Sequence, residues 1–361
     1  MEKLNLAIIG QGRSGRNIHG AFYKSARNEY FNVRYVVEAD EGRRARAAEE
    51  YPGCTVLADY RELFDRTDVD LVVNATYSNL HYPITMDLLS HGKNVLCEKP
   101  FCRTRKEADE MIALAKQNGC MLAVFQQTFF APFVKKAFEL IEAGTLGRIQ
   151  QVNLRYSGFG RRWDWQTLQW RCAGGVYNTG PHPIGLALGF LGFSPDTQIL
   201  YSSLDTALTS GDGDDCAKLL ITAPGKPLVD MEIHATDAFT NYNLKIMGTR
   251  GCFMCNAGSW WKLKYVVDGE NPDQPVKPNF LADENGMPIY CGEKLVAHEE
   301  EGKFEGSAFD IGTAGLYKNL YGVIRGTEEL IITPEMARDI IGVAEDMYQA
   351  TPLPQKFYEE K

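Results

Sequence analysis

The feature that most restricts the fold of this chain is a regular alternation of short apolar runs and helical segments over residues 1–125. The runs are rich in β-branched residues, which is typical of parallel strands buried on both faces. Right-handed crossovers between such strands give an α/β fold with a doubly wound Rossmann-type sheet. The pattern predicts strands over 4–9, 33–37, 70–75, 94–97 and 121–125, and helices over 13–26, 41–50, 79–90 and 104–118.

The pattern changes after residue 125, and strand-like segments dominate the rest of the chain. Joins such as 223–227, which contain Pro and Gly, are typical of hairpins and indicate an antiparallel or mixed sheet. A chain of 361 residues is long enough for two domains, which we place at 1–125 and 126–361. We expect strands over 149–156, 197–204, 216–222, 228–236, 242–248, 251–255 and 260–267, helices over 132–143, 309–326 and 334–350, and a loop over 268–306.

The charge balance restricts the partners of the chain. Lys and Arg number 38 against 47 Asp and Glu, a net charge of −9, and no block of basic residues offsets it. We therefore expect neither a nucleic-acid nor a membrane partner, and no apolar run approaches the roughly 20 residues that span a bilayer. The nine cysteines show no convincing metal-binding spacing, so we expect reduced thiols, no metal site and a cytoplasmic location.

A glycine-rich turn lies between the first predicted strand and the first predicted helix. Residues Gly10, Gln11, Gly12, Arg13, Ser14 and Gly15 fit Gly-x-Gly-x-x-Gly, in which the backbone approaches a pyrophosphate at a helix N-terminus. The second strand ends at Glu38, where a carboxylate suits the hydroxyls of the adenosine ribose. A 2′-phosphate beside Glu38 would be repelled, which favours NAD over NADP, although Arg43 and Arg44 follow closely.

Four further motifs occur in a fixed order along the chain. Residues 75–81 read Ala-Thr-Tyr-Ser-Asn-Leu-His, residues 92–100 end in Glu98-Lys99-Pro100, residues 144–148 read Gly-Thr-Leu-Gly-Arg, and residues 174–182 run from Gly174-Gly175 to His182. Together with Thr-Pro-Glu at 333–335, they make the chain resemble the Gfo/Idh/MocA oxidoreductases, the family of glucose–fructose oxidoreductase and inositol dehydrogenase.

The resemblance implies an NAD-binding domain over 1–125 and a domain over 126–361 that binds substrate on a large open, mostly antiparallel sheet. We expect that sheet to pair the chain with a second subunit in a homo-oligomer. The resemblance also implies that Lys99 and His182 reach the substrate alcohol, helped by the residue at position 178, and that the Lys99–Pro100 bond is cis. It places Thr76, Tyr77, Asn79, His81, Glu98, Lys99 and Gln127 at the cofactor, beside the glycine-rich turn.

The chain departs from the family pattern at three places. The acid that family members carry four residues before the histidine is Asn178 here, and the acid three residues after it is Gly185. Asn can hydrogen-bond a hydroxyl but cannot share a proton, so Lys99 and His182 would carry the proton chemistry alone. At 126–129, Gln-Gln-Thr-Phe replaces a segment that in many members has Arg before Phe.

The segment from Tyr156 to Gln166 combines aromatic, basic, acidic and amide side chains. That mixture suits a sugar ring, because aromatic faces stack on its C–H surface while polar groups bind its hydroxyls. We select Tyr156, Arg162, Trp163 and Asp164, with Lys99, Asn178 and His182, as the substrate-binding set. The alternative is that the aromatics are core residues and the arginines are solvated. We expect structural or surface roles for His19, His91, His234 and His298.

The chemistry of these residues favours an oxidoreductase that uses NAD on a secondary hydroxyl. A desolvated Lys99 beside a positive nicotinamide ring would have its pKa lowered from about 10.4 toward 7–8, and could then act as the base. The substrate would be a small molecule, namely a sugar, glycoside or cyclic polyol, with C3 oxidation of a glycoside to a 3-oxo sugar as the sharper hypothesis. The alternatives are an inositol dehydrogenase, an NAD-dependent glycosidase or lyase that oxidises its substrate transiently, and a non-catalytic NAD-responsive regulator.

Overall fold

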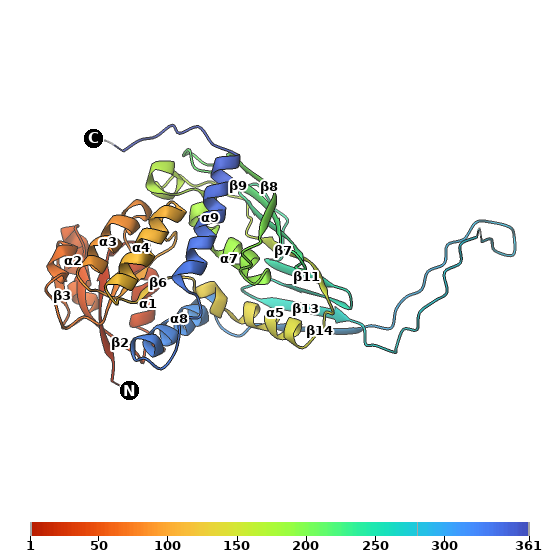
Figure 1. Cartoon of the computed structure of the whole chain (residues 1–361), viewed down its shortest axis with the longest axis horizontal. Helices are drawn as coiled ribbons and strands as arrows, with labels where there is room; N and C mark the ends of the chain where they lie inside the picture. The colour runs from red at the N-terminus through yellow and green to blue at the C-terminus, as the bar shows by residue number, and fades with distance from the viewer. Residues whose placement is uncertain (1, 280, 360–361) are drawn as a thin grey trace.

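The N-terminal domain is built on a sheet of six parallel strands in the order β3-β2-β1-β4-β5-β6 (Figure 1). The computed structural model describes residues 2–279 and 281–359. This strand order is that of a dinucleotide-binding Rossmann domain, which confirms the predicted fold. The strands are β1 (Leu4–Ile9), β2 (Phe31–Val37), β3 (Thr55–Leu57), β4 (Leu71–Asn74), β5 (Val95–Cys97) and β6 (Leu122–Val124).

The helices of this domain are α1 (Gly20–Tyr23), α2 (Glu41–Glu50), α3 (His81–Ser90) and α4 (Arg105–Gln117). The side chains of Asp40 and Thr104 cap α2 and α4 by accepting backbone N–H groups, as such residues do at helix starts. The helix expected over 13–26 is wrong at its end, since a π-helical turn at Arg13–His19 leads into α1 and stops at Tyr23. There the hydroxyl of Ser25 donates to the carbonyl of Phe22, which competes with continued helix.

The second domain contains an eight-stranded sheet in the order β14-β13-β12-β11-β7-β10-β9-β8, in which only the β7–β10 pair is parallel. Helices α5 (Pro132–Glu142), α7 (Pro181–Phe190) and α9 (Pro334–Ala350) lie on one face of this sheet (Figure 1). The strands are β7 (Ile149–Arg155), β8 (Gln198–Asp205), β9 (Cys216–Thr222), β10 (Leu228–His234), β11 (Leu244–Gly248), β12 (Gly251–Cys255), β13 (Trp260–Tyr265) and β14 (His298–Lys303).

Strand β14 lies where the sequence predicted only a loop. Its residues are almost all charged, so it has no apolar alternation, and it forms the exposed edge of the sheet. Its pairing with β13 is supported by ion pairs, with Lys264 Nζ 2.5 Å from Glu299 and Lys262 Nζ 3.5 Å from Glu301. Charges of this kind are common on edge strands, where they discourage pairing with other sheets.

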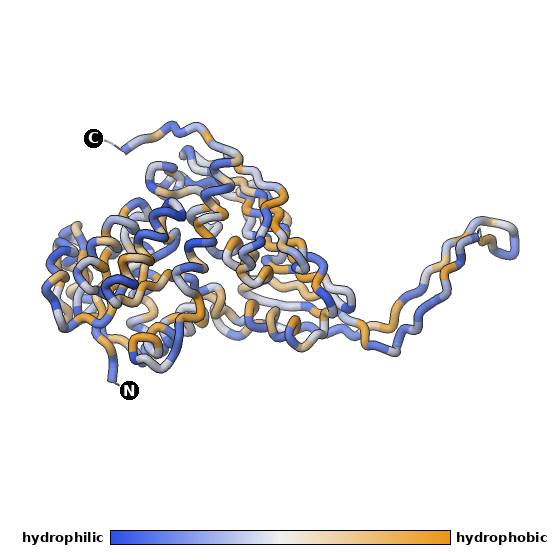
Figure 2. The backbone as a smooth tube through the Cα atoms, in the orientation of Figure 1, coloured by the Kyte–Doolittle hydropathy of each residue, from blue (hydrophilic) through white to orange (hydrophobic). Residues whose placement is uncertain are grey.

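Helix α8 (Ala308–Ile324) returns to the first domain, although it follows the second sheet in the chain. Its Tyr317 is fully buried and stacks on Phe22, with ring centroids 4.6 Å apart. Figure 2 shows hydrophobic stretches along the strands inside both domains, and α8 adds to the one around β1. The core of the N-terminal domain is therefore completed by a helix from near the C-terminal end of the chain.

A long ribbon leaves the second sheet between β13 and β14 and points away from both domains (Figure 1). We call residues 268–279 and 281–297 the arm. Within the described residues, no helix is both long enough and apolar enough to cross a membrane.

Candidate active site

The glycine-rich turn after β1 is shaped by close backbone contacts. Gly10 has a φ of +94°, and a side chain there would lie 2.6 Å from the carbonyl oxygen of Ala75. A side chain at Gly15 would collide with the carbonyl oxygen of Gly10, so both positions require glycine. A side chain at Gly12, in contrast, would meet nothing within 4 Å. The first N–H groups of a helix have no partner within it, so this open face suits a pyrophosphate.

Glu38 stands beside this turn at the end of β2. Its buried carboxylate accepts the N–H of Gln11 at 2.7 Å and the N–H of Asp40 at 3.0 Å, and Nη1 of Arg43 lies 3.7 Å away. Arg44 is turned back onto the chain, because its guanidinium donates to the carbonyls of Glu38 and Ala39 at 2.8 and 2.6 Å. A fixed carboxylate next to an open glycine turn fits the ribose and pyrophosphate of a dinucleotide.

The loop after β4 joins the two domains. Tyr77 meets Trp165 edge-on at 5.0 Å, and the guanidinium of Arg171 lies 4.5 Å from the Tyr77 ring. The same guanidinium donates to the side-chain oxygen of Asn79 at 3.4 Å, while the Thr76 hydroxyl donates to Asn74 at 2.7 Å. The exposed part of this loop is thus held against the second domain.

His81 begins α3 and is almost fully buried. Its Nδ1 lies 2.6 Å from the carbonyl oxygen of Pro100, and its Nε2 lies 3.3 Å from that of Thr76. Burial lowers the pKa of His81, so the ring is neutral and donates to Pro100. His81 therefore ties the loop after β4 to the turn that carries Lys99.

Lys99 follows β5 and reaches across the cleft to the second domain. The Lys99–Pro100 bond is cis, which confirms the expectation from the family. The Nζ of Lys99 donates to the backbone carbonyl of Asn178 at 2.9 Å. Burial lowers the pKa of Lys99, opposed by the charge of Glu98 and assisted by the charges of Arg13 and Arg162. The amine is thus held in place and biased toward its neutral form.

Glu98 is the end of a buried hydrogen-bond chain that sequence reasoning missed. The hydroxyl of Tyr23 donates to that of Tyr317, which donates to Nδ1 of His19 at 2.7 Å, and Nε2 of His19 donates to Oε1 of Glu98 at 3.0 Å. The other carboxylate oxygen accepts the N–H of Lys99 at 3.0 Å. Burial alone would raise the pKa of Glu98, but the bond from His19 and the nearby positive charges lower it to about 2.

His182 enters the site from the first turn of α7. The hydroxyl of Thr128 lies 2.8 Å from its Nδ1, and sequence reasoning did not single out this threonine. Burial and, to a lesser extent, the charge of Lys99 lower the pKa of His182 to about 3, so the imidazole is neutral. Within residues 2–279 and 281–359, Nε2 has no hydrogen-bond partner, which leaves it for a ligand.

A chain of side chains fixes the amide of Asn178. The guanidinium of Arg162 holds both oxygens of Asp164 and donates to Oε1 of Gln166, and Nε2 of Gln166 donates to Oδ1 of Asn178 at 2.8 Å. Arginine can only donate, so the orientation of both amides follows from it. Asn178 therefore offers its NH₂ group, a donor, to the site.

A cavity of about 360 Å³ opens in the second domain next to Asn178. It brings together Tyr156, Arg162 and Asn178 from the predicted set, together with Gln166, while Asp164 orients Arg162 and Trp163 is 77% exposed. His234 also lines it, which the sequence did not indicate. Because Asn178 bonds to Lys99, the cavity ends one hydrogen bond from the amine.

Asp214 is a buried carboxyl in the wall of this cavity that the sequence also did not indicate. Burial raises its pKa to about 7, against the stabilising bonds from Tyr348 at 2.6 Å and from the N–H of Val176 at 2.9 Å. Val176 belongs to the short helix α6 (Gly175–Asn178), which ends at the residue that bonds Lys99. Asp214 therefore supports the helix that carries Asn178.

Two family models match this chain. The model described as an oxidoreductase family with an NAD-binding Rossmann fold matches residues 4–126, and the GFO/IDH/MocA C-terminal domain matches residues 134–254. The chain belongs to the Gfo/Idh/MocA oxidoreductase family. The resemblance read from the motifs is thereby confirmed, and NAD is the cofactor of the N-terminal domain.

Three curated proteins are similar in sequence to this Gfo/Idh/MocA protein. An uncharacterized oxidoreductase, C26H5.09c of Schizosaccharomyces pombe, is 29% identical over 78% of this chain and 77% of its own length. A 2,7-anhydro-N-acetylneuraminate hydratase of Mediterraneibacter gnavus is 25% identical over 96% and 94%. An inositol 2-dehydrogenase of Saccharopolyspora erythraea is 28% identical over 77% and 80%.

Solved structures share the fold over nearly the whole length. The putative oxidoreductase YvaA of Bacillus subtilis has a TM-score of 0.77 at 18% identity, and covers 97% of this chain and 96% of its own. GenD2 from gentamicin A biosynthesis, solved in complex with NAD, has a TM-score of 0.75 at 20% identity and covers 97% and 94%.

The structure gives a physical reason for one departure from the family pattern. A side chain at Gly185 would lie 3.0 Å from Ile340 and 3.2 Å from the ring of Phe129. The same ring also lies against Gly189, one turn further along α7. In this Gfo/Idh/MocA protein Phe129 therefore fills the space that a carboxylate at position 185 would need. The neighbouring Gln127 is also buried, and its Oε1 has no hydrogen-bond partner within the described residues.

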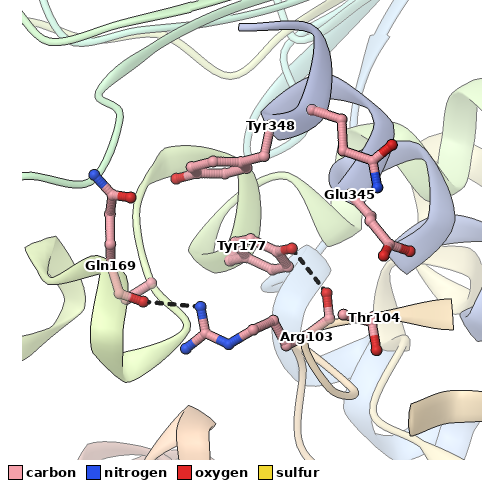
Figure 3. Close-up of a pocket in the computed structure, with 8 residues that line it drawn as sticks. Arg103, Thr104, Gln169, Tyr177, Glu345 and Tyr348 are labelled. Atoms are coloured by element: carbon pink, nitrogen blue, oxygen red, sulfur yellow. Dashed lines mark hydrogen bonds between the residues drawn. The ribbon is translucent and has the colours of Figure 1, made fainter. Parts of the chain in front are cut away.

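A second hollow, of about 230 Å³, lies on the domain junction (Figure 3). The guanidinium of Arg103 donates to the carbonyls of Gln169 and Trp170 at 3.1 and 2.9 Å, and the hydroxyl of Tyr177 donates to the carbonyl of Arg103 at 2.8 Å. These bonds tie the start of α4 to the segment before α6. They therefore connect the N-terminal domain to the second domain at this junction.

Proposed function

We propose that the protein transfers hydride between NAD and a secondary hydroxyl of a sugar, glycoside or cyclic polyol. The observation that carries this proposal is the bond from the amine of Lys99 to the backbone of Asn178, whose amide is fixed beside the cavity, with the neutral imidazole of His182 close enough to Lys99 for the charge of that amine to lower the pKa of His182. A base and two hydrogen-bonding groups are what the oxidation of an alcohol requires of the protein.

Bound NAD supplies the hydride acceptor at its nicotinamide ring. Lys99 takes the hydroxyl proton onto Nζ, and its bond to the Asn178 carbonyl keeps one N–H turned away from the substrate. The lowered pKa of Lys99 raises the fraction of amine that is free to accept that proton. In the reverse direction, the resulting ammonium returns the proton to the substrate oxygen.

His182 and Asn178 orient the substrate oxygen. With a pKa of about 3, His182 is neutral at pH 7 and carries a single N–H, so it acts as a hydrogen-bond partner and not as a cation. The NH₂ of Asn178 donates to the same oxygen or to a neighbouring hydroxyl. Both contributions increase as the oxygen gains negative charge, because hydrogen bonds to charged groups are stronger.

The substrate class follows from the rest of the cavity wall. Tyr156 offers an aromatic face, while Arg162, Gln166 and His234 offer polar groups, the combination that suits a sugar ring. A glycoside oxidised at C3 is the sharper hypothesis, and an inositol is its alternative, since one relative is named an inositol 2-dehydrogenase. The buried carboxylate of Glu38 favours NAD over NADP, and the nine free cysteines suit a cytoplasmic location.

The test is a substrate screen combined with Lys99→Ala. We expect the wild type to reduce NAD⁺ faster than NADP⁺ with at least one sugar, glycoside or inositol, followed at 340 nm. Lys99→Ala should lose at least about 10³-fold in kcat while NAD binding, measured by fluorescence titration, stays within a few-fold. Undiminished turnover in the variant would refute the role of Lys99.

A second candidate is a lyase or hydratase cycle, in which the substrate is oxidised, eliminates and is reduced again. The relative named a 2,7-anhydro-N-acetylneuraminate hydratase favours it. Steady production of NADH supports the dehydrogenase, whereas product formation without net NADH supports this cycle. A purely regulatory NAD-binding role is less favoured, because a sensor has no use for a held, desolvated lysine.

A further inference from the structure

The arm is an antiparallel ribbon with little contact to the rest of the chain. Near its base, Asn271 and Val296 exchange hydrogen bonds of 2.9 and 2.8 Å. Near its tip, the N–H of Asp283 donates to the carbonyl of Met287 at 2.9 Å, and that of Ile289 to Leu281 at 3.1 Å. The contacts described for the arm lie within it or at its junction with the sheet, so its two faces are open.

Both faces of the arm expose apolar side chains to solvent. Val276 is 89% exposed and Tyr290 is fully exposed, and Met287, Ile289, Leu295 and Val296 are also exposed. Figure 2 shows hydrophobic positions along the arm. A two-stranded ribbon is marginally stable by itself, and exposed apolar residues in such number mark an interaction surface. The arm therefore needs a partner surface.

The arm leaves the sheet at the end opposite to the cavity. Tyr265 and His298, which flank the arm, pair with each other, and Tyr265 also pairs with Gly251 near the start of β7. The cavity lies at the other end, where the chain continues beyond Arg155 of β7 and His234 of β10. Figure 1 shows the arm pointing away from that end, so it does not cover the cavity of its own chain.

The mouth of the cavity also exposes apolar side chains to solvent. Two loops, residues 157–163 and 235–243, meet there through the Phe159–Thr236 bridge, and we call them the cavity rim. Phe159 and Trp163 are exposed and Phe239 is 94% exposed, so the rim is apolar. The rim also carries Arg161 and Arg162 against one acid, Asp237, with Arg162 paired to Asp164, whereas the arm has six acidic and two basic residues. Both surfaces therefore expose apolar side chains, and the small basic excess of the rim is opposite in sign to the net charge of the arm.

We propose that the arm of a second copy of this chain covers the cavity rim. The sheet face opposite α7 and α9 carries the half-buried apolar side chains Leu220, Leu228, Met247 and Met254 around an ion-pair network of Arg155, Lys218, Asp230 and Glu232, and no helix of the described chain covers it. Two copies that pack these faces about a two-fold axis, with their strands in opposite directions, bring each arm base to the partner's cavity end. The two strands of the arm, each about ten residues long, then reach roughly 33 Å further along the rim.

The proposal rests on the proposed function only in treating this cavity as the substrate site. Its consequence is that the substrate site is completed by two subunits. The acidic and apolar side chains of the arm would close the mouth over a bound sugar, exclude water and add specificity that a single chain does not possess.

The first experiment needs no substrate. Cys291 lies on the arm and is exposed, while the other eight cysteines are buried or half-buried. We expect Phe239→Cys, treated with a short bis-maleimide, to give a covalent dimer on a denaturing gel, and Phe239→Cys with Cys291→Ser to give none. The matched control is Glu49→Cys on the outer surface of α2, which should not cross-link. No covalent dimer with Phe239→Cys, equal cross-linking in the control, or a wild type that sediments as a monomer would overturn the proposal.

The second experiment reads the arm through turnover. In the shortened chain, residues 272–295 are replaced by Asn-Gly, a sequence suited to a hairpin turn. Alone, it should bind NAD normally but show at least a tenfold higher KM. Mixed with Lys99→Ala, which has an intact arm, it should regain its KM because the arm is supplied in trans. An unchanged KM in the shortened chain would contradict the proposal. Absence of any turnover in wild type would refute the proposed function instead, and leave the cross-linking result to decide on the arm.

Discussion

The two sides of the cleft hold their functional groups by different means. On the cofactor side, Gly10 and Gly15 are fixed by contacts between backbone atoms, and Glu38 is held by two backbone N–H groups. On the substrate side, Asn178 is oriented by a relay of side chains that starts at Arg162. The shape of the glycine turn does not depend on most side chains. It cannot accept a side chain at Gly10 or Gly15, because that side chain would collide with backbone atoms. A side-chain relay can be rebuilt by single substitutions, which suits a surface that must differ among substrates.

Lys99 depends on both backbone and side-chain contacts. Its own position follows from the backbone after β5, and its partner is the backbone carbonyl of Asn178, yet its charge depends on side chains around it. The predictions below alter first the backbone side, then the buried support of Lys99, and finally the side-chain relay.

The largest effect is expected from a methyl group in the glycine turn. Gly15→Ala forces a side chain against the carbonyl oxygen of Gly10, so the turn and the helix must separate. We expect a loss of about 3 kcal/mol in the free energy of unfolding, as for overpacked interiors, together with loss of NAD binding. Thermal or denaturant unfolding and NADH fluorescence measure the two effects.

Gly12→Ala is the matched control. The space around Gly12 is open and its φ of −74° is compatible with alanine, so the free energy of unfolding should be unchanged or slightly higher. NAD affinity should still fall, because the added methyl occupies the place where the pyrophosphate would lie. If Gly12→Ala bound NAD as tightly as wild type, the cofactor would not lie against this turn.

A smaller effect is expected from the buried pair beneath Lys99. His19→Phe leaves the carboxylate of Glu98 buried without its donor, which should cost about 3 kcal/mol of stability at pH 7. The pKa of Glu98 is lowered in the folded protein to about 2, against about 4.3 unfolded. Its contribution is therefore complete above pH 4.3 and is lost as the pH falls toward 2.

The measurement is the free energy of unfolding as a function of pH for wild type, His19→Phe, Glu98→Gln and the double variant. The double variant should recover part of the loss, because a neutral side chain without a donor costs less than a charged one. Additive losses of the two single changes would show that His19 and Glu98 do not interact.

Much of the fold was predictable because its signals are local. The five principal Rossmann strands are continuous apolar runs, and helices α2 and α4 begin at the capping residues Asp40 and Thr104. Helix α7 was missed because it is apolar on nearly all sides, being buried between the sheet and α9, so it has no amphipathic pattern. Strand β14 was missed for the opposite reason, since an exposed edge strand needs no apolar residues at all.

The site was predictable where a motif carries it and not where contacts join distant segments. Lys99 and Asn178, which the family motifs single out, are joined by a hydrogen bond. His19 and Tyr317 are separated by 298 positions, and only the packing of α8 on the first domain brings them together. Thr128 could have been noticed as the polar residue in the altered 126–129 segment, but its contact with His182 depends on the position of α7.

The smallest and sharpest change is Asn178→Asp, which restores the acid of the family pattern on the residue whose carbonyl holds Lys99. The new carboxylate still accepts from Gln166, so the relay remains. Its charge favours the ammonium form of Lys99 and should raise the pKa of that amine by about 1 unit. Because the base must be neutral to accept a proton, the acidic limb of the kcat/KM profile for oxidation should move to higher pH by the same amount. Asn178→Ala is the control that removes the amide without adding a charge. It should weaken substrate binding but leave the acidic limb of the kcat/KM profile at the same pH. An acidic limb that stays in place in Asn178→Asp would mean that the ionisation of Lys99 does not govern the rate, and that the substrate side depends on position alone.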